Sequence, residues 1–207
     1  MPIFHHTKTH GRFFFIHIPR TAGRFLVENF LKKGYSVEHH LTQERIKEKE
    51  IPNYFWTPVD GVEIAHTHYS LYSKWKSIKD LPSIAVVRNP IDRFFSASGR
   101  MPSRFQSSVE NWTTFENFFS KAVLTHSHNW GRPQHEFVSP HTNIWKYEDG
   151  FGKNFCDWIN NILPVDISIT PQPTDKHSYD GQKLIKTKPL IDNIKKFYHQ
   201  DFEKFNY

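Results

Sequence analysis

Two arginines flank a short turn at residues 20–24, and their placement indicates that the chain binds an anion there. The stretch FFFIHIPRTAGRFLVENF, residues 13–30, reads as an apolar strand that stops at PRTAG and continues at once as an amphipathic helix. The first turn of a helix has backbone N–H groups without partners and carries the positive end of the helix dipole. With arginine beside them, these groups attract phosphate or sulfate.

A second unit of the same kind begins at residue 84. An apolar strand at 84–87 is followed by Arg88, and then by a helix in which Asn89 is the expected N-cap and Pro90 the first residue. Ser96 lies eight residues after Arg88, two turns along this helix and therefore on the same face. Arg88 and Ser96 can converge on one phosphate, so the two units together indicate a ligand with two separated anionic groups.

The remaining pattern supplies the elements that must position these residues. We expect helices at 23–33, 42–50, 114–124, 151–162 and 188–205, and strands at 12–18, 62–70, 84–87 and 142–146. Strands that alternate with helices predict a three-layer α/β domain, with a mostly parallel central sheet flanked by helices. Ligands of such sheets bind beyond the carboxyl ends of the strands, where PRTAG, HTH (66–68) and RNP (88–90) all fall. Residues 1–207 form a single domain, in which residues 1–11 are expected to be a flexible N-terminus.

Composition narrows the possible partners. The chain has 207 residues, a net charge of +6 and one cysteine, which excludes an internal disulfide. The positive charge suits an anionic ligand, but basic residues are spread along the chain and interrupted by acids, so no nucleic-acid partner is expected. No apolar run approaches the ~20 residues of a membrane span, and no signal peptide is apparent. We therefore expect a soluble, cytoplasmic or otherwise intracellular protein. His5, His6 and His10 have no second ligand cluster, and no metal site is expected.

Five segments together resemble a known family. IHIPRTAGRF resembles the 5′-phosphosulfate loop of PAPS-dependent sulfotransferases, in the carbohydrate group that includes the heparan sulfate 2-O-sulfotransferases, and AVVRNPIDRFFSAS is very similar to that family's 3′-phosphate-binding motif. HNWGRPQ, IWKYEDG and IKKFYHQDFEKFNY are similar to its later landmarks, in the expected order from residue 13 to residue 207. The resemblance implies a P-loop-like sulfotransferase fold.

The resemblance also implies an activity, in which a sulfuryl group passes from PAPS (3′-phosphoadenosine 5′-phosphosulfate) to an acceptor hydroxyl, expected on a carbohydrate. The product is PAP (3′,5′-ADP), and no metal is required. Arg20 stands where the family has a catalytic lysine, and the loop's usual hydroxyl pair is replaced by Arg24 and Phe25. The implied nucleotide-binding residues are Arg20, Thr21, Ala22, Gly23 and Arg24 for the 5′-phosphosulfate, and Arg88 and Ser96 for the 3′-phosphate.

The catalytic base and the acceptor site are the least specific parts of the pattern. EIAHTHYSLY is similar to the family's G-H-x-x-[YF] segment, and His66 matches its basic histidine, with His68 as the second choice. Imidazole titrates near neutrality and can accept the hydroxyl proton. Residues that could line the acceptor site, or alternatively form only a structural loop, are His128, Trp130, Arg132 and Gln134. Lys176 and His177 could reach the nucleotide from a late loop.

Two other functions remain open at the level of sequence. A nucleotide-dependent phosphotransferase with a degenerate phosphate loop would also place an anion at PRTAG, although GxxxxGK[ST] is absent. A basic nucleic-acid-binding protein would explain the positive charge and the many aromatic residues.

Overall fold

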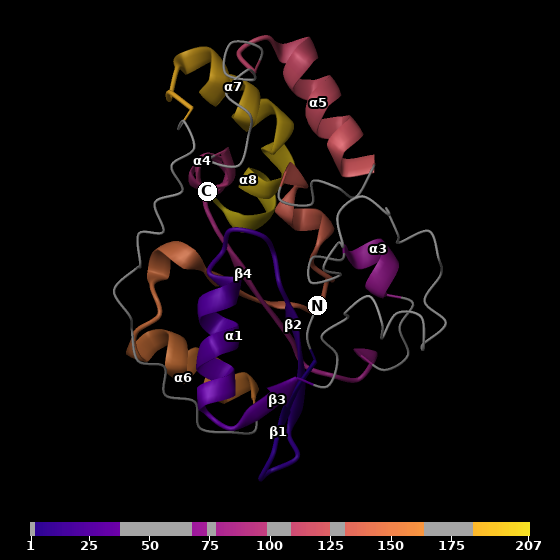
Figure 1. Cartoon of the computed structure of the whole chain (residues 1–207), viewed down its shortest axis with the longest axis vertical. Helices are drawn as coiled ribbons and strands as arrows, with labels where there is room; N and C mark the ends of the chain where they lie inside the picture. The colour runs from indigo at the N-terminus through magenta and orange to yellow at the C-terminus, as the bar shows by residue number, and fades with distance from the viewer. Residues whose placement is uncertain (1–2, 38–67, 74–77, 99–108, 125–130, 164–183) are drawn as a thin grey trace.

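The computed structural model describes residues 3–37, 68–73, 78–98, 109–124, 131–163 and 184–207. These residues form a five-stranded sheet with helices packed against it, and further helices gathered beyond one end of its strands (Figure 1). The strand order is β3-β1-β2-β4-β5. The bounds of the strands are β1 Ile3–His6, β2 Arg12–Ile16, β3 Tyr35–Val37, β4 Ser83–Val87 and β5 Asn143–Lys146.

The sheet is mixed, where a mostly parallel sheet is expected from sequence. β2 pairs with β4 and β4 with β5 in parallel, but β1 pairs with both β2 and β3 antiparallel. The difference arises at the N-terminus, because residues 3–6 form β1 instead of a flexible extension. Ile3 and Phe4 are buried, and a short turn then brings the chain back as β2, which makes the pair antiparallel.

The helices and 3₁₀ turns account for most of the remaining described residues. They are α1 Gly23–Lys32, α3 Tyr69–Tyr72, α4 Pro90–Ser98, α5 Trp112–Leu124, α6 Lys153–Ile162, α7 Lys188–Phe197 and α8 His199–Phe205, with 3₁₀ turns η6 Gln134–Glu136 and η7 Tyr147–Asp149. Most ends lie within two residues of the sequence prediction. The predicted strand at 62–70 is wrong at its end, because Tyr69 and Ser70 begin α3. The predicted helix at 42–50 lies outside the described residues.

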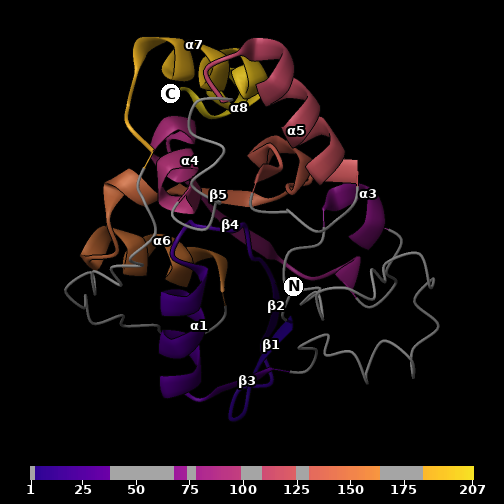
Figure 2. The same cartoon turned by 45° about the horizontal axis from the view of Figure 1, so that its top comes forward.

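Alternate side chains of β2 divide the core between the two faces of the sheet. Phe13 and Phe15 pack with Leu26 of α1 and Phe155 of α6, which lie on the same side of the sheet (Figures 1 and 2). Phe14 and Ile16 face the other way and pack with Tyr72 of α3, Phe137 and Phe205 of α8. This two-residue alternation is the ordinary consequence of strand geometry. Helices therefore cover both faces.

A third cluster of buried residues lies between α4, α5 and α7. Phe94, Phe115, Phe119 and Ile194 contribute to it, and Figure 2 shows the three helices together at the top of the molecule. The predicted single helix at 188–205 is wrong, because the chain turns at Tyr198 and forms α7 and α8. The turn lets α7 pack against α4 and α5 while Phe205 of α8 reaches the sheet.

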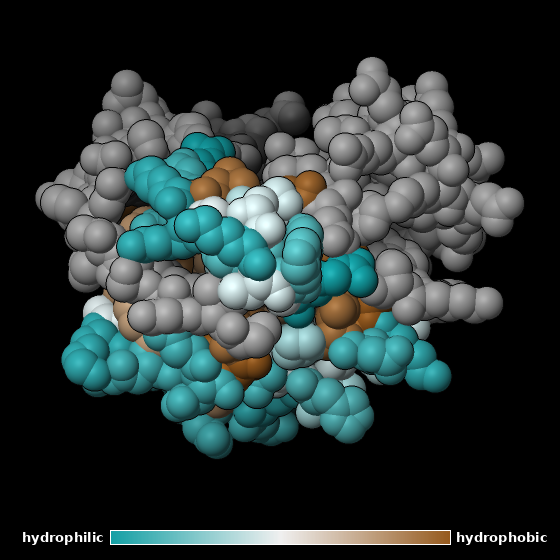
Figure 3. All heavy atoms as spheres, turned by 90° about the horizontal axis from the view of Figure 1, so that it is seen from below, coloured by the Kyte–Doolittle hydropathy of each residue, from teal (hydrophilic) through white to brown (hydrophobic). Residues whose placement is uncertain are grey.

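Hydrophilic side chains cover most of the described surface at the end of the molecule seen from below (Figure 3). The anion-binding candidates lie where β2 and β4 finish, between the sheet and the helices beyond it (Figure 1). Among the described helices, none is both long enough and apolar enough to cross a membrane.

Candidate functional site

The loop between β2 and α1 adopts an uncommon backbone conformation. Arg20 and Ala22 have φ angles of 70° and 69°, in the left-handed region that residues with a Cβ seldom occupy. The side chain of Thr21 is buried, and its hydroxyl donates to the carbonyl oxygen of Ile18 at 2.9 Å. Ala22 is the N-cap of α1 and makes no side-chain capping bond. The first amides of α1 therefore receive no side-chain acceptor from their cap.

Gly23 allows the loop to pack closely against the end of β2. A Cβ atom at this position would lie 1.9 Å from the ring of His17, far inside van der Waals contact. Any larger residue would push the histidine ring or the helix start aside. Gly23 therefore has a steric reason to be glycine, and the amides of the first turn of α1 stay close to the sheet.

Arg88, directly after β4, has its backbone held by the side chain of Gln134. The Arg88 N–H donates to Gln134 Oε1 at 2.9 Å, and Gln134 Nε2 donates to the Arg88 carbonyl oxygen at 2.7 Å. The Arg88 guanidinium lies over the Tyr147 ring, 4.4 Å from its centroid. Its Nε is buried and has no hydrogen-bond partner within the described part of the chain. The guanidinium thus retains a donor for a ligand.

The two arginine loops meet at one edge of the sheet. β2 and β4 are parallel, as the sequence predicts, and are neighbours in the sheet, so both loops leave from the same ends of their strands. Arg88 Nη1 donates weakly to the Arg20 carbonyl oxygen at 3.5 Å. Arg20 Nε and Nη2 donate to Ser96 Oγ at 3.1 and 2.9 Å. The structure therefore brings together Arg20, Arg88 and Ser96, three of the residues selected from sequence.

Arg20 belongs to the loop expected to hold the 5′-phosphosulfate, but its guanidinium is bonded to the other unit. Its guanidinium is attached to Ser96 on α4, which is the unit expected to hold the 3′-phosphate. Ser96 Oγ accepts both of these bonds, and a serine hydroxyl still has one hydrogen to donate. Arg24, on the first turn of α1, is exposed.

Arg93 is a positioning residue that the sequence reasoning missed. Its side chain is 2% exposed, and its Nε donates to the Pro19 carbonyl oxygen at 3.0 Å. This bond ties α4 to the PRTAG loop. Burial lowers the pKa of the Arg93 guanidinium, while the neighbouring Tyr198 and Asp201 act in the opposite direction. The signal in the sequence was an arginine on the otherwise apolar face of α4.

Asp201 fixes the segment that holds the Arg88 loop in place. Its carboxylate is completely buried and accepts the backbone N–H groups of Gln134 and His135 at 2.7 and 2.8 Å. The same Oδ1 lies 2.8 Å from His135 Nδ1. Asp201 thus fixes η6, and Gln134 in η6 fixes Arg88. Asp201 lies in IKKFYHQDFEKFNY, one of the segments that resemble the family, but the sequence assigns no role to this residue.

Two of the four residues expected to line an acceptor site are buried. Gln134 is completely buried and bonded to the Arg88 backbone on both sides. Arg132 is 6% exposed and forms an ion pair with Glu136. Both side chains are used inside the protein, which corrects the expectation that they face an acceptor.

One of the two candidate bases, His68, belongs to the described residues. His68 is described: it directly precedes α3, is largely buried, and its Nδ1 lies 2.8 Å from Ser70 Oγ. His66, the first choice, lies outside the described residues. The same is true of His128, Trp130, Lys176 and His177.

Comparison with known proteins adds no identification, since no family model, no curated protein and no solved structure matches the chain. In the described residues, no group of three or more His, Cys, Asp or Glu side chains is placed to hold a metal ion.

Proposed function

We propose that this protein is a sulfotransferase, which moves a sulfuryl group from PAPS to a hydroxyl of a carbohydrate acceptor. The observation that carries the proposal is the meeting of two strand–arginine–helix units on parallel neighbouring strands. Each unit offers donors to one anionic group, and PAPS has an anionic group at each end of its ribose. The motif resemblance supplies the direction, with the first unit for the 5′-phosphosulfate and the second for the 3′-phosphate.

The side chains of the second unit fit a phosphate. Arg88 Nε is buried without a hydrogen-bond partner in the described residues, and a buried donor of this kind is costly unless a ligand satisfies it. The hydroxyl hydrogen of Ser96 is not used by Arg20, because Ser96 acts as the acceptor in both bonds. These two residues would hold the 3′-phosphate.

The backbone of the first unit fits a second anion. The helix dipole and the first amides of α1 favour negative charge, and the cap residue Ala22 brings no side-chain acceptor to compete. Thr21 would contribute its N–H, since its hydroxyl is bonded to Ile18. Arg24 is exposed beside this turn and adds positive charge.

For this reaction the protein has to supply a base and to stabilise the leaving phosphate. PAPS supplies an activated sulfuryl group, so the new bond joins sulfur to the acceptor oxygen as the bond to the 5′-phosphate oxygen breaks. His66 takes the proton of the acceptor hydroxyl. The amides at the start of α1 stabilise the negative charge that develops on the leaving phosphate. Arg20, bonded to Ser96 in the structure, would have to turn away from Ser96 to add its charge there. His68 contributes to acceptor binding.

A melting experiment tests the nucleotide preference directly. At a concentration one hundred times its Kd, 3′,5′-ADP should stabilise the protein by about 2.7 kcal/mol. For a chain of this size that corresponds to a rise in Tm of roughly 5–10 °C. The rise should occur without magnesium, and 5′-AMP at the same concentration should give much less. Stabilisation by ATP with Mg²⁺, and none by 3′,5′-ADP, would replace this proposal with a phosphotransferase.

A further inference from the structure

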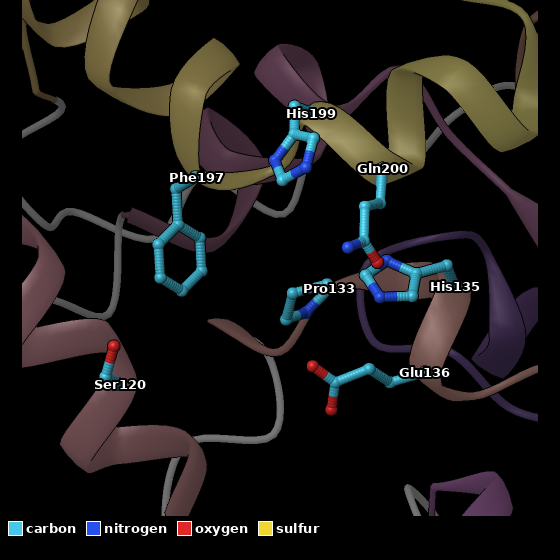
Figure 4. A pocket seen from close by; sticks show the side chains of 7 residues that line it. All are labelled: Ser120, Pro133, His135, Glu136, Phe197, His199 and Gln200. Carbon is cyan, nitrogen blue, oxygen red and sulfur yellow. The ribbon is translucent and has the colours of Figure 1, made fainter.

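A groove lined by both polar and apolar groups lies around His135 and is built from residues that the nucleotide site does not use. One part is a depression of about 420 Å³, whose lining side chains face a common space in Figure 4. An adjoining depression of about 440 Å³ shares His135 and Gln200 with it. We call the two together the His135 groove. Its lining residues are Ser120, Pro133, His135, Glu136, Phe197, His199, Gln200, Glu203 and Lys204.

The groove is connected to the Arg88 loop through the chain itself. Gln134 holds the Arg88 backbone with both ends of its amide, and His135 is the next residue in the chain. Arg88 Nη1 in turn contacts the Arg20 carbonyl oxygen. The groove is therefore connected, through Gln134 and Arg88, to the loop that would hold the sulfuryl group.

The His135 ring is held in one orientation. Its Nδ1 lies 2.8 Å from Oδ1 of the completely buried Asp201. A carboxylate only accepts hydrogen bonds, so in the neutral ring Nδ1 carries the hydrogen and Nε2 keeps a lone pair. Nε2 lies across the ring from the Asp201 contact. It is therefore the nitrogen available to accept a hydroxyl hydrogen from a ligand in the groove.

The charges around the groove are balanced. Glu136 pairs with Arg132, and Glu203 is followed directly by Lys204. A site for a polyanion would instead show an excess of arginine and lysine. Uncharged partners with both donors and acceptors remain available in the Ser120 hydroxyl and the Gln200 amide.

We propose that the His135 groove binds the acceptor, and that the acceptor is an uncharged oligosaccharide. Sugar hydroxyls both donate and accept hydrogen bonds, which matches His135, Ser120 and Gln200. The C–H face of a sugar ring matches the ring of Phe197, which also lines the groove. This proposal rests on the sulfotransferase function and specifies its substrate class.

Saturation-transfer NMR on the full chain tests the proposal. The probes are neutral hexasaccharides of glucose, mannose, galactose and N-acetylglucosamine, with a heparin hexasaccharide as the polyanion. At least one neutral probe should show saturation transfer, and the heparin probe should not. His135→Ala should weaken binding of that probe roughly five- to tenfold, the usual effect of losing one hydrogen bond. Gln200→Ala, at an exposed residue, should weaken it by a smaller factor. His141→Ala removes an exposed histidine outside the groove and should change nothing.

The outcomes separate this proposal from the one on which it rests. If 3′,5′-ADP binds but no neutral probe does, or if heparin binds alone, the groove proposal fails and the sulfotransferase function stands. Equal binding by wild type, His135→Ala and Gln200→Ala would also overturn it. If a neutral probe binds through His135 while 3′,5′-ADP does not bind at all, the groove stands as a sugar site and the sulfotransferase function fails.

Discussion

Replacing Gln134 by methionine should both destabilise the protein and weaken nucleotide binding. Methionine has nearly the same length as glutamine, so the buried space stays filled, but both bonds to the Arg88 backbone are lost. Each bond contributes about 1 kcal/mol net, and the stranded N–H and carbonyl of Arg88 add a desolvation cost. We expect the free energy of unfolding to fall by about 2–4 kcal/mol in total. Because Arg88 is no longer fixed, 3′,5′-ADP should bind about tenfold more weakly.

Urea denaturation measures the first effect. With a slope of about 2–3 kcal/mol per molar, the urea midpoint should fall by roughly 1–2 M. Gln200→Met makes the same chemical change at an exposed position, and its free energy of unfolding should stay within about 0.5 kcal/mol of wild type. Calorimetric titration of the folded Gln134→Met variant with 3′,5′-ADP measures the second effect. An unchanged midpoint with unchanged affinity would refute the reasoning that Gln134 positions Arg88.

Three further predictions concern the nucleotide, the alkaline stability and the base. Arg88→Ala should weaken 3′,5′-ADP binding by roughly ten- to hundredfold, because losing a hydrogen bond to a charged group costs ~1.5–3 kcal/mol. The binding of 5′-AMP should weaken much less. Titration with both nucleotides checks this, and equal weakening would mean that Arg88 has a structural role. Burial raises the pKa of Tyr35 to about 12, so stability present below its usual value of about 10 is lost as pH rises towards 12. Tyr35→Phe removes this loss and a buried hydroxyl without a partner in the described residues, so it should be equally stable or about 1 kcal/mol more stable at pH 9. Its advantage in urea midpoint should widen by pH 11.5, and a constant difference would contradict the assignment. His66→Ala should cut turnover by about 10²–10⁴ and leave 3′,5′-ADP affinity intact, with a milder loss for His68→Ala; steady-state rates that show the reverse would make His68 the base.

Much of the local structure follows from the sequence because short-range physics dictates it. The apolar runs at β2 and β4 predict buried strands, and Asn89 followed by Pro90 predicts the start of α4. Asn89 Oδ1 accepts the backbone N–H of Ile91 at 3.0 Å, as an N-cap does. Strands that alternate with helices predict parallel strands, and β2 and β4 are parallel. Parallel strands end at the same edge of a sheet, which is why the sequence predicts both arginine loops there.

Only the tertiary structure decides which polar side chains support the site from inside the protein and which remain available to a ligand. Gln134 and Arg132 look like acceptor residues in the sequence, but packing turns them inward, one onto the Arg88 backbone and the other onto Glu136. The sequence assigns no role to Arg93 or Asp201, yet each is buried where another segment supplies its partner, 74 and 67 residues away for Pro19 and Gln134. The strand β1 and the turn at Tyr198 are decided in the same way, by burial of Phe4 and Phe205 against the sheet. Hydrophobic period and capping are properties of neighbouring residues, so sequence determines them. Hydrogen bonds between distant segments exist only once the chain has closed on itself.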